Sequence, residues 1–439
     1  MSKKSKKALV PELRFPEFQE AEKWQKIRLI DTADKKIKWS FIGGPFGSNL
    51  KSSDYVADGV RIIQLQNIGD AEFFDDYKIF TSEEKADELL ANNIYPGEIL
   101  LSKMGDPVGR ACLIPTTHPR YVMCSDGIRL VVDEKIFSKY FIYTLINSVQ
   151  FRPLVDKTAT GSTRKRIGLD DLKNLPMVVP KKEEQEKIAN CLSSIDDLII
   201  AHVQNLDVIK SHKKGLIQQL FPAGGEAVPK LRFPGFRKDG KWTEYQLGQC
   251  LSRHPEYGIN APAVPYSDNL PTYLRITDIS EDGLIRQDQK VSVAKEVTDE
   301  NYLDEGDIVL ARTGASVGKT YKYRAKDGRL VFAGFLIRVK PDAKKLNSEL
   351  LFQFFSTEQY WHWVNLTSAR SGQPGINGNE YSLLPIPLPP TLKEQQKIAD
   401  FLLSIDEFIS VHKQKIDALK AHKKGLMQQL FPVMDEVNE

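Results

Sequence analysis

The chain has 439 residues, a formal net charge of +3, 41% hydrophobic residues and 27% charged residues. This length allows two to four domains, and the composition is that of an ordinary globular protein. No apolar run approaches the ~18 residues that a membrane span needs, so no contact with a membrane is expected. The small net charge excludes a strongly basic molecule, so residues that bind nucleic acid would have to gather on one surface.

The N-terminus and the cysteines favour a cytoplasmic protein. The first fifteen residues, MSKKSKKALVPELRF, are basic but lack the apolar stretch of a secretion signal. Cys112, Cys124, Cys191 and Cys250 form no C-x-x-C pair, and no histidine stands near them at the spacing of metal ligands. We therefore expect reduced thiols and no metal site.

The chain begins with an N-terminal segment, residues 1–21, which is expected to pack near helices, and continues with a first domain, residues 22–180. In this domain short β-rich runs alternate with turn-rich loops, and a helical run follows them. Such an order predicts an α+β domain with a twisted sheet. The runs are VRIIQLQNI (60–68), EILLSKM (98–104), GIRLVV (127–132) and the helical SKYFIYTLINS (138–148).

A long helix is predicted over residues 181–222. Pro176 and Pro180 favour an extended chain before it, and Phe221 followed by Pro222 stops it. Its apolar residues alternate in steps of four and three, which is the 3.5-residue period of a coiled-coil seam. A helix of about 40 residues is ~60 Å long. The predicted seam positions are Ile188, Leu192, Ile195, Ile199, Leu206, Ile209, Leu216 and Leu220.

The second half of the chain repeats this order. A linker over residues 223–239 precedes a second α+β domain over 240–390, a second long helix over 391–432 and a tail over 433–439. The domain has the β-rich runs TYLRITDI, DIVLARTG and FLIRVK and the helical run SELLFQFFSTEQYWHWV (348–364). The predicted seam positions of the second helix are Ile398, Leu402, Ile405, Ile409, Ile416, Leu419, Leu426 and Leu430.

An internal duplication underlies this order. Residues 184–222 align with 394–432 without a gap, and about 24 of 39 positions are identical. PELRFPEF (11–18) likewise matches PKLRFPGF (229–236). The period of about 210 residues is too long for a solenoid. The helices stayed alike while the domains between them diverged. This difference indicates that the two helices have the same role and the two domains have different ones.

Each seam has two polar interruptions, at His202 and Lys213 and at His412 and Lys423. Polar seam residues usually fix the register of a coiled coil at some cost in stability. An alternative is that they bind an ion or nucleic acid, and the first interpretation is favoured. The two helices are expected to pair within the chain, because both strands of the coil are present.

The glycine motif GASVGKT (314–320) is close to a phosphate-binding loop but has three residues between its glycines where that loop has four. A strand-like run follows it, where a phosphate-binding loop would open a helix. We expect a turn between two strands here and at GDPVGRA (105–111), with phosphate contacts from neighbouring basic residues. These candidates are Lys103, Arg110, Arg312 and Lys319.

Two further loops suit nucleic acid better than catalysis. TATGSTRKRIGLDD (158–171) and its counterpart TSARSGQPGING (367–378) combine small residues with Arg, Gln and Asn, the side chains that recognise base edges. The alternative is a solvated loop with incidental charge. Gly-rich segments 43–51 and 257–269 are similar. The candidates are Ser48, Asn49, Lys51, Arg164, Lys165, Arg166, Tyr257, Asn260, Tyr266, Arg370, Gln373 and Asn377.

Catalytic patterns are absent from the sequence. It contains no Asn-Pro-Pro-Tyr or Asp-Pro-Pro-Tyr, no GxSxG elbow and no His, Asp and Glu at metal-ligand spacing. We therefore expect no catalytic residue and no cofactor bound by this chain.

The chain resembles the specificity subunit of a type I restriction-modification system over nearly all of its length. The resemblance depends on the LRFP starts, GGPFGSNLKSSDY, YGINAPA, LPIPLPPTLKEQQKIADFL and the HKKGLMQQLFP ending, in this order. It implies two target-recognition domains that each bind one half of a bipartite, asymmetric target in double-stranded DNA. It also implies that the two long helices form an antiparallel intramolecular coiled coil. Half-sites one turn of DNA apart are ~34–36 Å between centres, a spacing that such a coil is long enough to hold.

The same resemblance implies partners. Two methyltransferase (modification) subunits would dock on this chain, and restriction subunits would join that core. S-adenosylmethionine, ATP and magnesium are expected on those partner subunits, with no catalysis by this chain. Two alternatives stay open: the specificity subunit of another restriction type (type IIB-like), and a coiled-coil adaptor that binds only proteins. Only the adaptor predicts that the assembled complex has no salt-dependent affinity for DNA.

Overall fold

The computed structural model describes residues 9–162, 164–286, 289–370 and 372–432, so the predicted tail lies outside the described residues. The chain divides into two compact units. The first unit comprises residues 1–202 and 415–439, and the second comprises residues 203–414. Each unit therefore contains one α+β domain and part of both long helices. Within the described ranges, none of the helices has both the length and the apolar character that crossing a bilayer requires.

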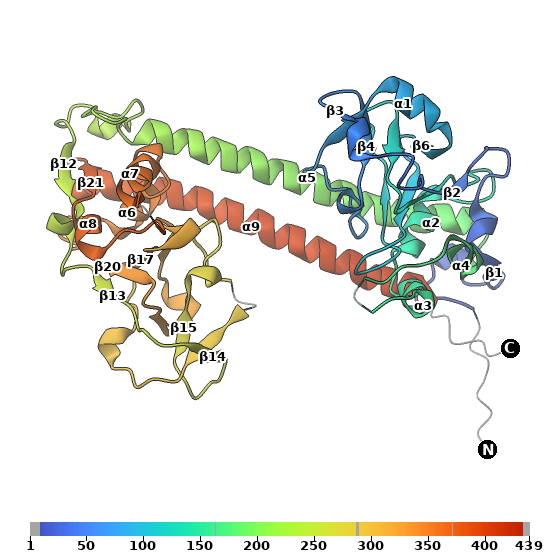
Figure 1. Ribbon diagram of the computed structural model, residues 1–439. Helices are drawn as coiled ribbons and strands as arrows, with labels where there is room; N and C mark the ends of the chain where they lie inside the picture. Colours follow the sequence, from blue (N-terminus) through green and yellow to red (C-terminus); the bar gives the residue numbers. More distant parts are fainter. Residues whose placement is uncertain (1–8, 163, 287–288, 371, 433–439) are drawn as a thin grey trace, which may run out of the picture. The chain divides into compact units, whose positions relative to one another are not determined.

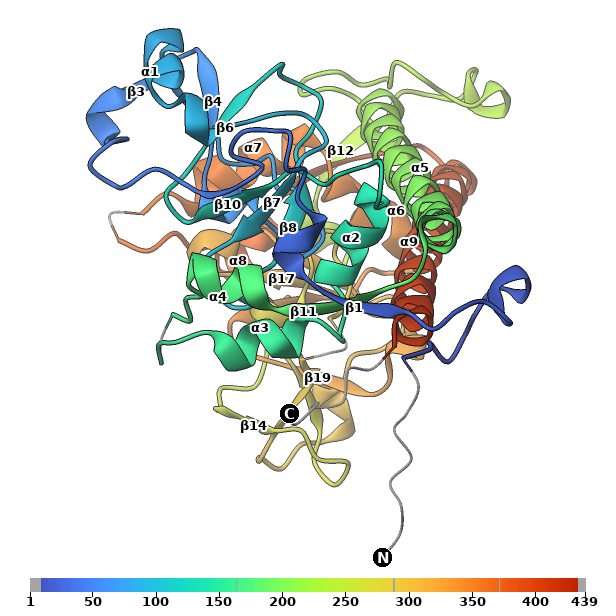
Figure 2. The same ribbon diagram turned by 90° about the vertical axis from the view of Figure 1, so that its right-hand side faces the viewer.

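The first unit is built on a four-stranded antiparallel sheet with the order β2-β10-β7-β8. Its edge strand β2 is labelled in Figure 1, and the other three strands are labelled in Figure 2. The expected runs at 98–104 and 127–132 supply its two central strands, whose residues are all buried. A helix, α2, packs against β8 (Figure 2). The bounds are β2 Phe41–Gly43, β7 Ile99–Ser102, β8 Ala111–Leu113, β10 Gly127–Leu130 and α2 Lys139–Ile146.

A second sheet of this unit has the order β3-β5-β4-β9-β6, in which β4 and β9 are parallel. A separate ribbon of β1 and β11 leads into the first long helix. The strand bounds are β1 Gln25–Arg28, β3 Tyr55–Val56, β4 Val60–Ile63, β5 Ile79–Thr81, β6 Asn93–Ile94, β9 Tyr121–Met123 and β11 Pro176–Val179. The shorter helices are α1 Glu83–Glu88, α3 Arg152–Thr158 and α4 Leu169–Asn174.

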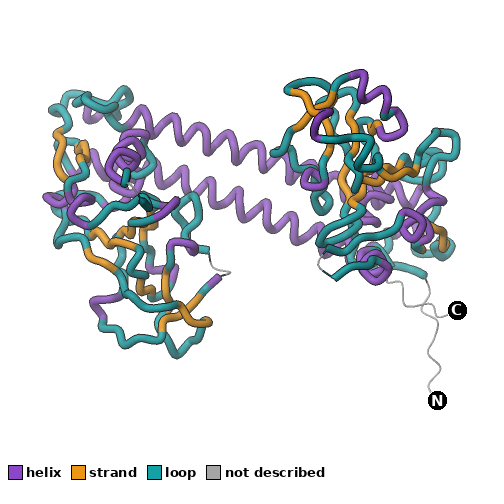
Figure 3. The backbone as a smooth tube through the Cα atoms, in the orientation of Figure 1, coloured by secondary structure: helices purple, strands orange, loops and turns teal. Residues whose placement is uncertain are grey.

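The second unit repeats this topology. Its antiparallel sheet has the order β13-β20-β17-β18, and its other sheet has the order β14-β16-β15-β19 with one parallel pair, β15 and β19. The place of β6 is taken by a single bridge between Tyr302 and Val331. In both units the short strands are separated by long loops (Figure 3). The bounds are β12 Thr243–Gln246, β13 Glu256–Tyr257, β14 Ala263–Pro265, β15 Thr272–Leu274, β16 Val291–Val293, β17 Ile308–Ala311, β18 Thr320–Lys322, β19 Leu330–Phe332, β20 Leu336–Val339 and β21 Pro385–Leu388.

The helical run at 348–364 forms two helices, α6 Ser348–Phe354 and α7 Glu358–Ser368. Thr357 separates them because its hydroxyl accepts a hydrogen bond from the backbone N–H of Tyr360 (3.2 Å), which caps α7. The rings of Phe355 and Tyr360 pack across the break, 4.8 Å between centroids. A short helix, α8 Gly378–Ser382, then leads to β21.

The long helices are α5 Lys182–Leu220 and α9 Leu392–Leu430, each of 39 residues. In the first unit, the start of α5 (Ile188 and Leu192) shares a core with the end of α9 (Leu430). In the second unit, the end of α5 (Leu220) shares a core with the start of α9 (Ile398). The helices therefore pack antiparallel in each unit. All sixteen predicted seam positions are buried or half-buried.

The polar seam lysines form ion pairs across the helices. Lys423 contacts both carboxylate oxygens of Asp196 at 2.6 Å in the first unit. Lys213 contacts those of Asp406 at 2.6 and 2.8 Å in the second. A shift in register would leave these half-buried charges without partners, which agrees with a role in fixing the register.

A buried arginine joins each LRFP segment to the start of a long helix. In the first unit, Arg14 donates to both carboxylate oxygens of Glu184 at 2.8 and 2.7 Å. In the second, Arg232 donates to both oxygens of Glu394 at 2.7 Å. All four side chains are at most 7% exposed. Each LRFP segment also donates a backbone hydrogen bond to the end of the other helix, from Leu13 in the first unit and Leu231 in the second.

We expect Arg14→Ala and Arg232→Ala each to lower the free energy of unfolding by about 3–5 kcal/mol, because each leaves a buried glutamate without its partner. Urea unfolding followed by tryptophan fluorescence measures the loss. Arg28→Ala is the matched control, since Arg28 pairs with Asp31 on the surface and its removal should cost nothing measurable. Equal stability of the Arg14 and Arg28 variants would show that the buried pair does not stabilise the fold.

Candidate nucleic-acid interface

The predicted polar loops of the first domain meet at one end of its four-stranded sheet. Backbone hydrogen bonds hold them together: the N–H of Gly44 donates to Gly127 (2.8 Å), that of Lys103 to Asp126 (2.6 Å) and that of Ile167 to Lys103 (3.0 Å). We call this region the first loop edge. It comprises residues 44–51, 103–105, 124–127, 160–162 and 164–167.

The second domain has the same arrangement at the corresponding strand ends. The N–H of Gly258 donates to Leu336 (3.3 Å), that of Arg312 to Phe335 (3.1 Å) and that of Ile376 to Arg312 (2.9 Å). The second loop edge comprises residues 257–261, 312–314, 333–336 and 372–377. Two domains with divergent sequences therefore present loops from the same topological positions.

A glycine is required where the chain leaves the sheet at each loop edge. A Cβ on Gly44 would lie 1.8 Å from the carbonyl oxygen of Cys124. A Cβ on Gly258 would lie 2.3 and 2.4 Å from the carbonyl oxygens of Phe332 and Ala333. No other residue permits this close approach of two backbones, which explains the glycines of GGPFG and YGINA.

On the first loop edge, backbone hydrogen bonds from Ile167 to Lys103 and from Gly105 to Lys165 bring the segments 103–105 and 164–167 together. Arg164 is exposed and makes no ion pair with another described residue, whereas Lys165 pairs with Asp156 and Arg166 with Asp126. Lys103 is half-buried. The exposed Ser48, Asn49 and Lys51 lie on the loop after β2.

On the second loop edge, an arginine is held over an aromatic ring. The guanidinium of Arg312 lies 4.9 Å from the ring centroid of Tyr257, and its Nη1 donates to the carbonyl of Gly334. The Nε of Arg312 is buried and has no hydrogen-bond partner among the residues that the structure describes. Gln373 is exposed beside Gly314, and Asn260 is exposed after Gly258. Asn377 caps α8 by accepting from the N–H of Glu380, so its side-chain oxygen is already used within the fold.

The remaining predicted residues have other partners. Arg110 donates to the backbone carbonyls of Leu65 and Ile68 and so ties the β7–β8 connection to the other sheet. Arg370 pairs with Glu380. Tyr266 lies next to β14 and donates to Asp268, and this hydrogen bond raises the pKa of its hydroxyl. Lys319 pairs with Glu281 at 2.7 Å and lines a cavity in the second unit.

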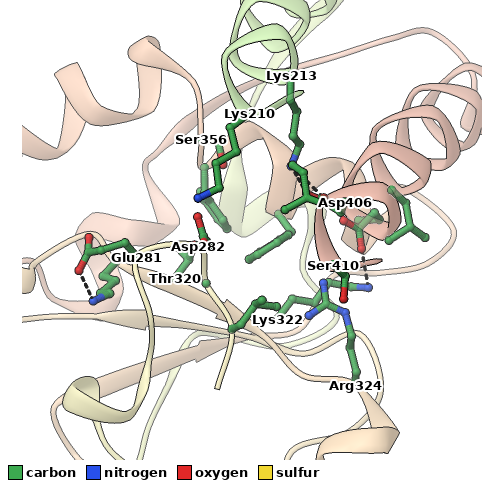
Figure 4. Close-up of a pocket in the computed structure, with 18 of the residues that line it drawn as sticks. Lys210, Lys213, Glu281, Asp282, Thr320, Lys322, Arg324, Ser356, Asp406 and Ser410 are labelled. Carbon is green, nitrogen blue, oxygen red and sulfur yellow. Dashed lines mark hydrogen bonds and ion pairs between the residues drawn. The ribbon is translucent and has the colours of Figure 1, made fainter. Parts of the chain in front are cut away.

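This cavity, of about 1020 Å³, lies between the β17–β18 hairpin, α6 and the two long helices (Figure 4). Most of its lysines are neutralised by pairing, as Lys213 is with Asp406 and Lys322 with Glu349. Lys413 likewise pairs with Asp282. Of these pairs, Lys413–Asp282 joins the second domain to α9, whereas Lys213–Asp406 joins the two long helices and Lys322–Glu349 joins β18 to α6. Among the described residues, no group of three or more His, Cys, Asp or Glu side chains is placed to hold a metal ion.

Two exposed phenylalanines on the loop edges were not among the predicted residues. Phe46 lies on the first edge and Phe335 on the second. The sequence did contain a signal for Phe46, which stands between two glycines in GGPFGSN. Phe46 was not predicted because its ring has no hydrogen-bonding group that could recognise a phosphate or a base edge.

A family model for the type I restriction modification DNA specificity domain matches the chain twice, over residues 60–211 and 269–421. Each match begins in an α+β domain and ends in the long helix that follows it, and together they cover well over half of the chain. The chain belongs to the type I restriction-modification DNA specificity family. The resemblance seen in the sequence is thereby confirmed.

Known members of the family agree with this assignment. The type I restriction enzyme MjaVIII specificity subunit of Methanocaldococcus jannaschii is 24% identical over 409 residues, which are 87% of this chain and 84% of that protein. The crystal structure of the type I restriction-modification S subunit from M. genitalium has a TM-score of 0.57 at 17% identity, covering 97% of this chain and 100% of that one.

A second solved structure, from work on complex assembly and conformational transition of the type I restriction-modification system, has a TM-score of 0.53 at 14% identity. It covers 93% of this chain and 97% of its own. At these identities the likeness concerns the fold. The predicted fold class, two mixed α+β domains with two long helices that pack together, is confirmed.

We expect Gly44→Ala to lower the free energy of unfolding by about 1–3 kcal/mol, because the added methyl group overlaps the Cys124 carbonyl. Gly47→Ala is a control within the same loop, since nothing lies within 4 Å of its Cβ position. Thermal or urea unfolding of both variants measures the difference. If the two variants were equally stable, the first loop edge would not be held in the packing described here.

Proposed function

We propose that this subunit recognises a bipartite, asymmetric DNA sequence, with residues 22–180 binding one half-site and residues 240–390 the other. The observation that supports this proposal is the matched pair of loop edges. Both edges are assembled by equivalent backbone hydrogen bonds, yet they present different side chains. Two domains that share an architecture but present different side chains would recognise two different half-sites.

The side chains on each edge suit such recognition. Arg164 on the first edge and Arg312 on the second provide the planar, bidentate donor that fits guanine, and Gln373 fits adenine. Lys165 and Arg166 are partly exposed and paired with surface aspartates. Pairs of this kind contribute little to stability, so phosphates could replace the aspartates when DNA binds. Phosphate contacts of this kind would position the duplex without specifying its sequence.

We further propose that two methyltransferase subunits dock on the long helices and carry the catalysis and its cofactors. Two identical partners require matching surfaces. Leu198 on α5 and Phe408 on α9 occupy equivalent positions of the duplication, and both are exposed, at 52% and 64%. Exposed apolar side chains at equivalent positions are what docking of one partner twice would need. Restriction subunits would then bind to that core, and S-adenosylmethionine, ATP and magnesium would bind to partner subunits.

The experiment that tests recognition is mapping of methylated bases in host DNA with and without this gene. We expect a motif of two separated blocks that disappears when the gene is removed. Arg312→Ala should relax one position of one block only, with a loss of discrimination of about 1–3 kcal/mol. A motif without two blocks, or an effect of Arg312→Ala on both blocks, would contradict the proposal. The purified complex should also lose DNA affinity steeply as salt rises.

Docking is tested by the stoichiometry of the purified complex. Leu198→Asp and Phe408→Asp should each reduce the methyltransferase subunits per chain from two to one, and the double variant should bind none, because a charge is placed in an apolar contact. Native mass spectrometry measures the ratio. Ile136→Asp, on an exposed loop of the first domain, is the control and should keep both partners. Full occupancy in all variants would place the docking surface elsewhere.

A further inference from the structure

Two exposed phenylalanines mark the loop edges. Phe46 is 82% exposed, more than any other large hydrophobic side chain among the described residues, and Phe335 is 61% exposed. Single exposed hydrophobic residues are common and need no explanation by themselves. What distinguishes these two is their place, since each lies in the loop edge of a different domain, among the side chains proposed to face DNA.

The backbone holds Phe46 in position while its side chain stays in solvent. Gly44 packs directly against the Cys124 carbonyl, and Pro45 is buried. The carbonyl of Phe46 then accepts a hydrogen bond from the N–H of Asn49 (2.8 Å), which closes a turn. The ring therefore projects from an anchored turn, next to the exposed Ser48 and Asn49.

Phe335 is held in a comparable way on the second edge. Its carbonyl accepts from the N–H of Arg312, and the preceding Gly334 donates to Ile259 (2.8 Å) and accepts from the Arg312 guanidinium. Arg312 in turn stacks on the exposed ring of Tyr257. Phe335 thus stands beside a pre-positioned arginine, with little conformational freedom of its backbone.

An apolar side chain on a surface that binds DNA can contribute to base recognition. Thymine carries a methyl group in the major groove, where apolar side chains contact it and polar ones gain nothing. The polar residues of both edges, Arg164, Arg312 and Gln373, are those that bind major-groove edges. We propose that Phe46 and Phe335 each contact the methyl group of one thymine, Phe46 in the first half-site and Phe335 in the second. This inference rests on the proposed function.

The two phenylalanines come from different loops of the shared topology. Phe46 follows β2, where the second domain has the exposed Asn260. Phe335 precedes β20, where the first domain has Asp126 paired with Arg166. The thymine therefore occupies a different position within each half-site, which adds to the asymmetry of the target.

The test uses the assembled complex of this subunit with its methyltransferase and a duplex carrying the mapped target. Each thymine is replaced singly by deoxyuridine, which removes only the methyl group. With the wild-type chain, we expect one thymine in each half-site whose replacement weakens binding about four-fold, the value of one buried methyl-sized group. Phe46→Ala should abolish this dependence in the first half-site only, and Phe335→Ala in the second only.

Matched variants distinguish the loss of a contact with the thymine methyl group from damage to the fold. Phe46→Leu and Phe335→Leu keep an apolar side chain and should keep the dependence on the methyl group, whereas Ile136→Ala should change neither half-site. A half-site without thymine on either strand, or a deoxyuridine effect that persists unchanged in the Ala variants, would overturn the inference. Failure of the proposed function has a different result, because the wild-type complex would then show no two-part target at all.

Discussion

The buried pairs Arg14–Glu184 and Arg232–Glu394 are the constraint on which the rest of the structure depends. Removing two charges from water is costly, and only full hydrogen bonding offsets that cost. Both guanidiniums meet this condition, because each binds its carboxylate through two N–H groups and a backbone carbonyl through a third, at Ala21 or Asp239. Each pair also places a negative charge in the first turn of a long helix, where the helix dipole favours it. Losing either partner would leave the other buried and uncompensated, which explains why LRFP and the glutamate occur together in both halves.

The seam shows how one helical frame accommodates two different domains. Asp196 and Asp406 both receive a lysine from the opposite helix, but their further partners differ. In the first unit, the hydroxyl of Tyr140 donates to Asp196, and burial raises the pKa of this tyrosine, so it stays protonated and remains a donor. In the second unit, Gln353 joins Asp406 to Glu349. The lysine–aspartate pair common to both units fixes the register of the helices. The additional partner, Tyr140 or Gln353, is supplied by the domain of that unit.

The helices and strands that follow from patterns of neighbouring residues could be predicted from the sequence. The four-three spacing and the Phe-Pro stops placed both helices within two residues of their observed bounds, and the central strands β7, β10, β17 and β20 fell inside the predicted runs. Contacts between distant segments were not predictable. Arg110 was predicted to contact phosphate because it follows glycines in the sequence. In the structure it donates to backbone carbonyls that lie more than 40 residues earlier in the chain. The helical run at 348–364 is broken at Thr357, whose hydroxyl caps α7. The apolar residues on both sides of Thr357 gave no sign of this break. The duplication predicted two α+β domains with counterpart loops, but the strand order that their sheets share could not be predicted, because the sequences of the two domains had diverged.

This divergence has a physical basis in how the loop edges are held. The bonds that assemble them run between backbone groups, as from Gly44 to Gly127 and from Gly258 to Leu336, so they do not depend on the identity of most side chains. Only the glycines are fixed, by the close approach of two backbones. The fold itself uses the side-chain oxygen of Asn377 and the guanidinium of Arg110. Exposed side chains such as those of Arg164, Gln373 and Phe46 can change without disturbing the core, so the two domains can diverge in sequence while they keep one topology.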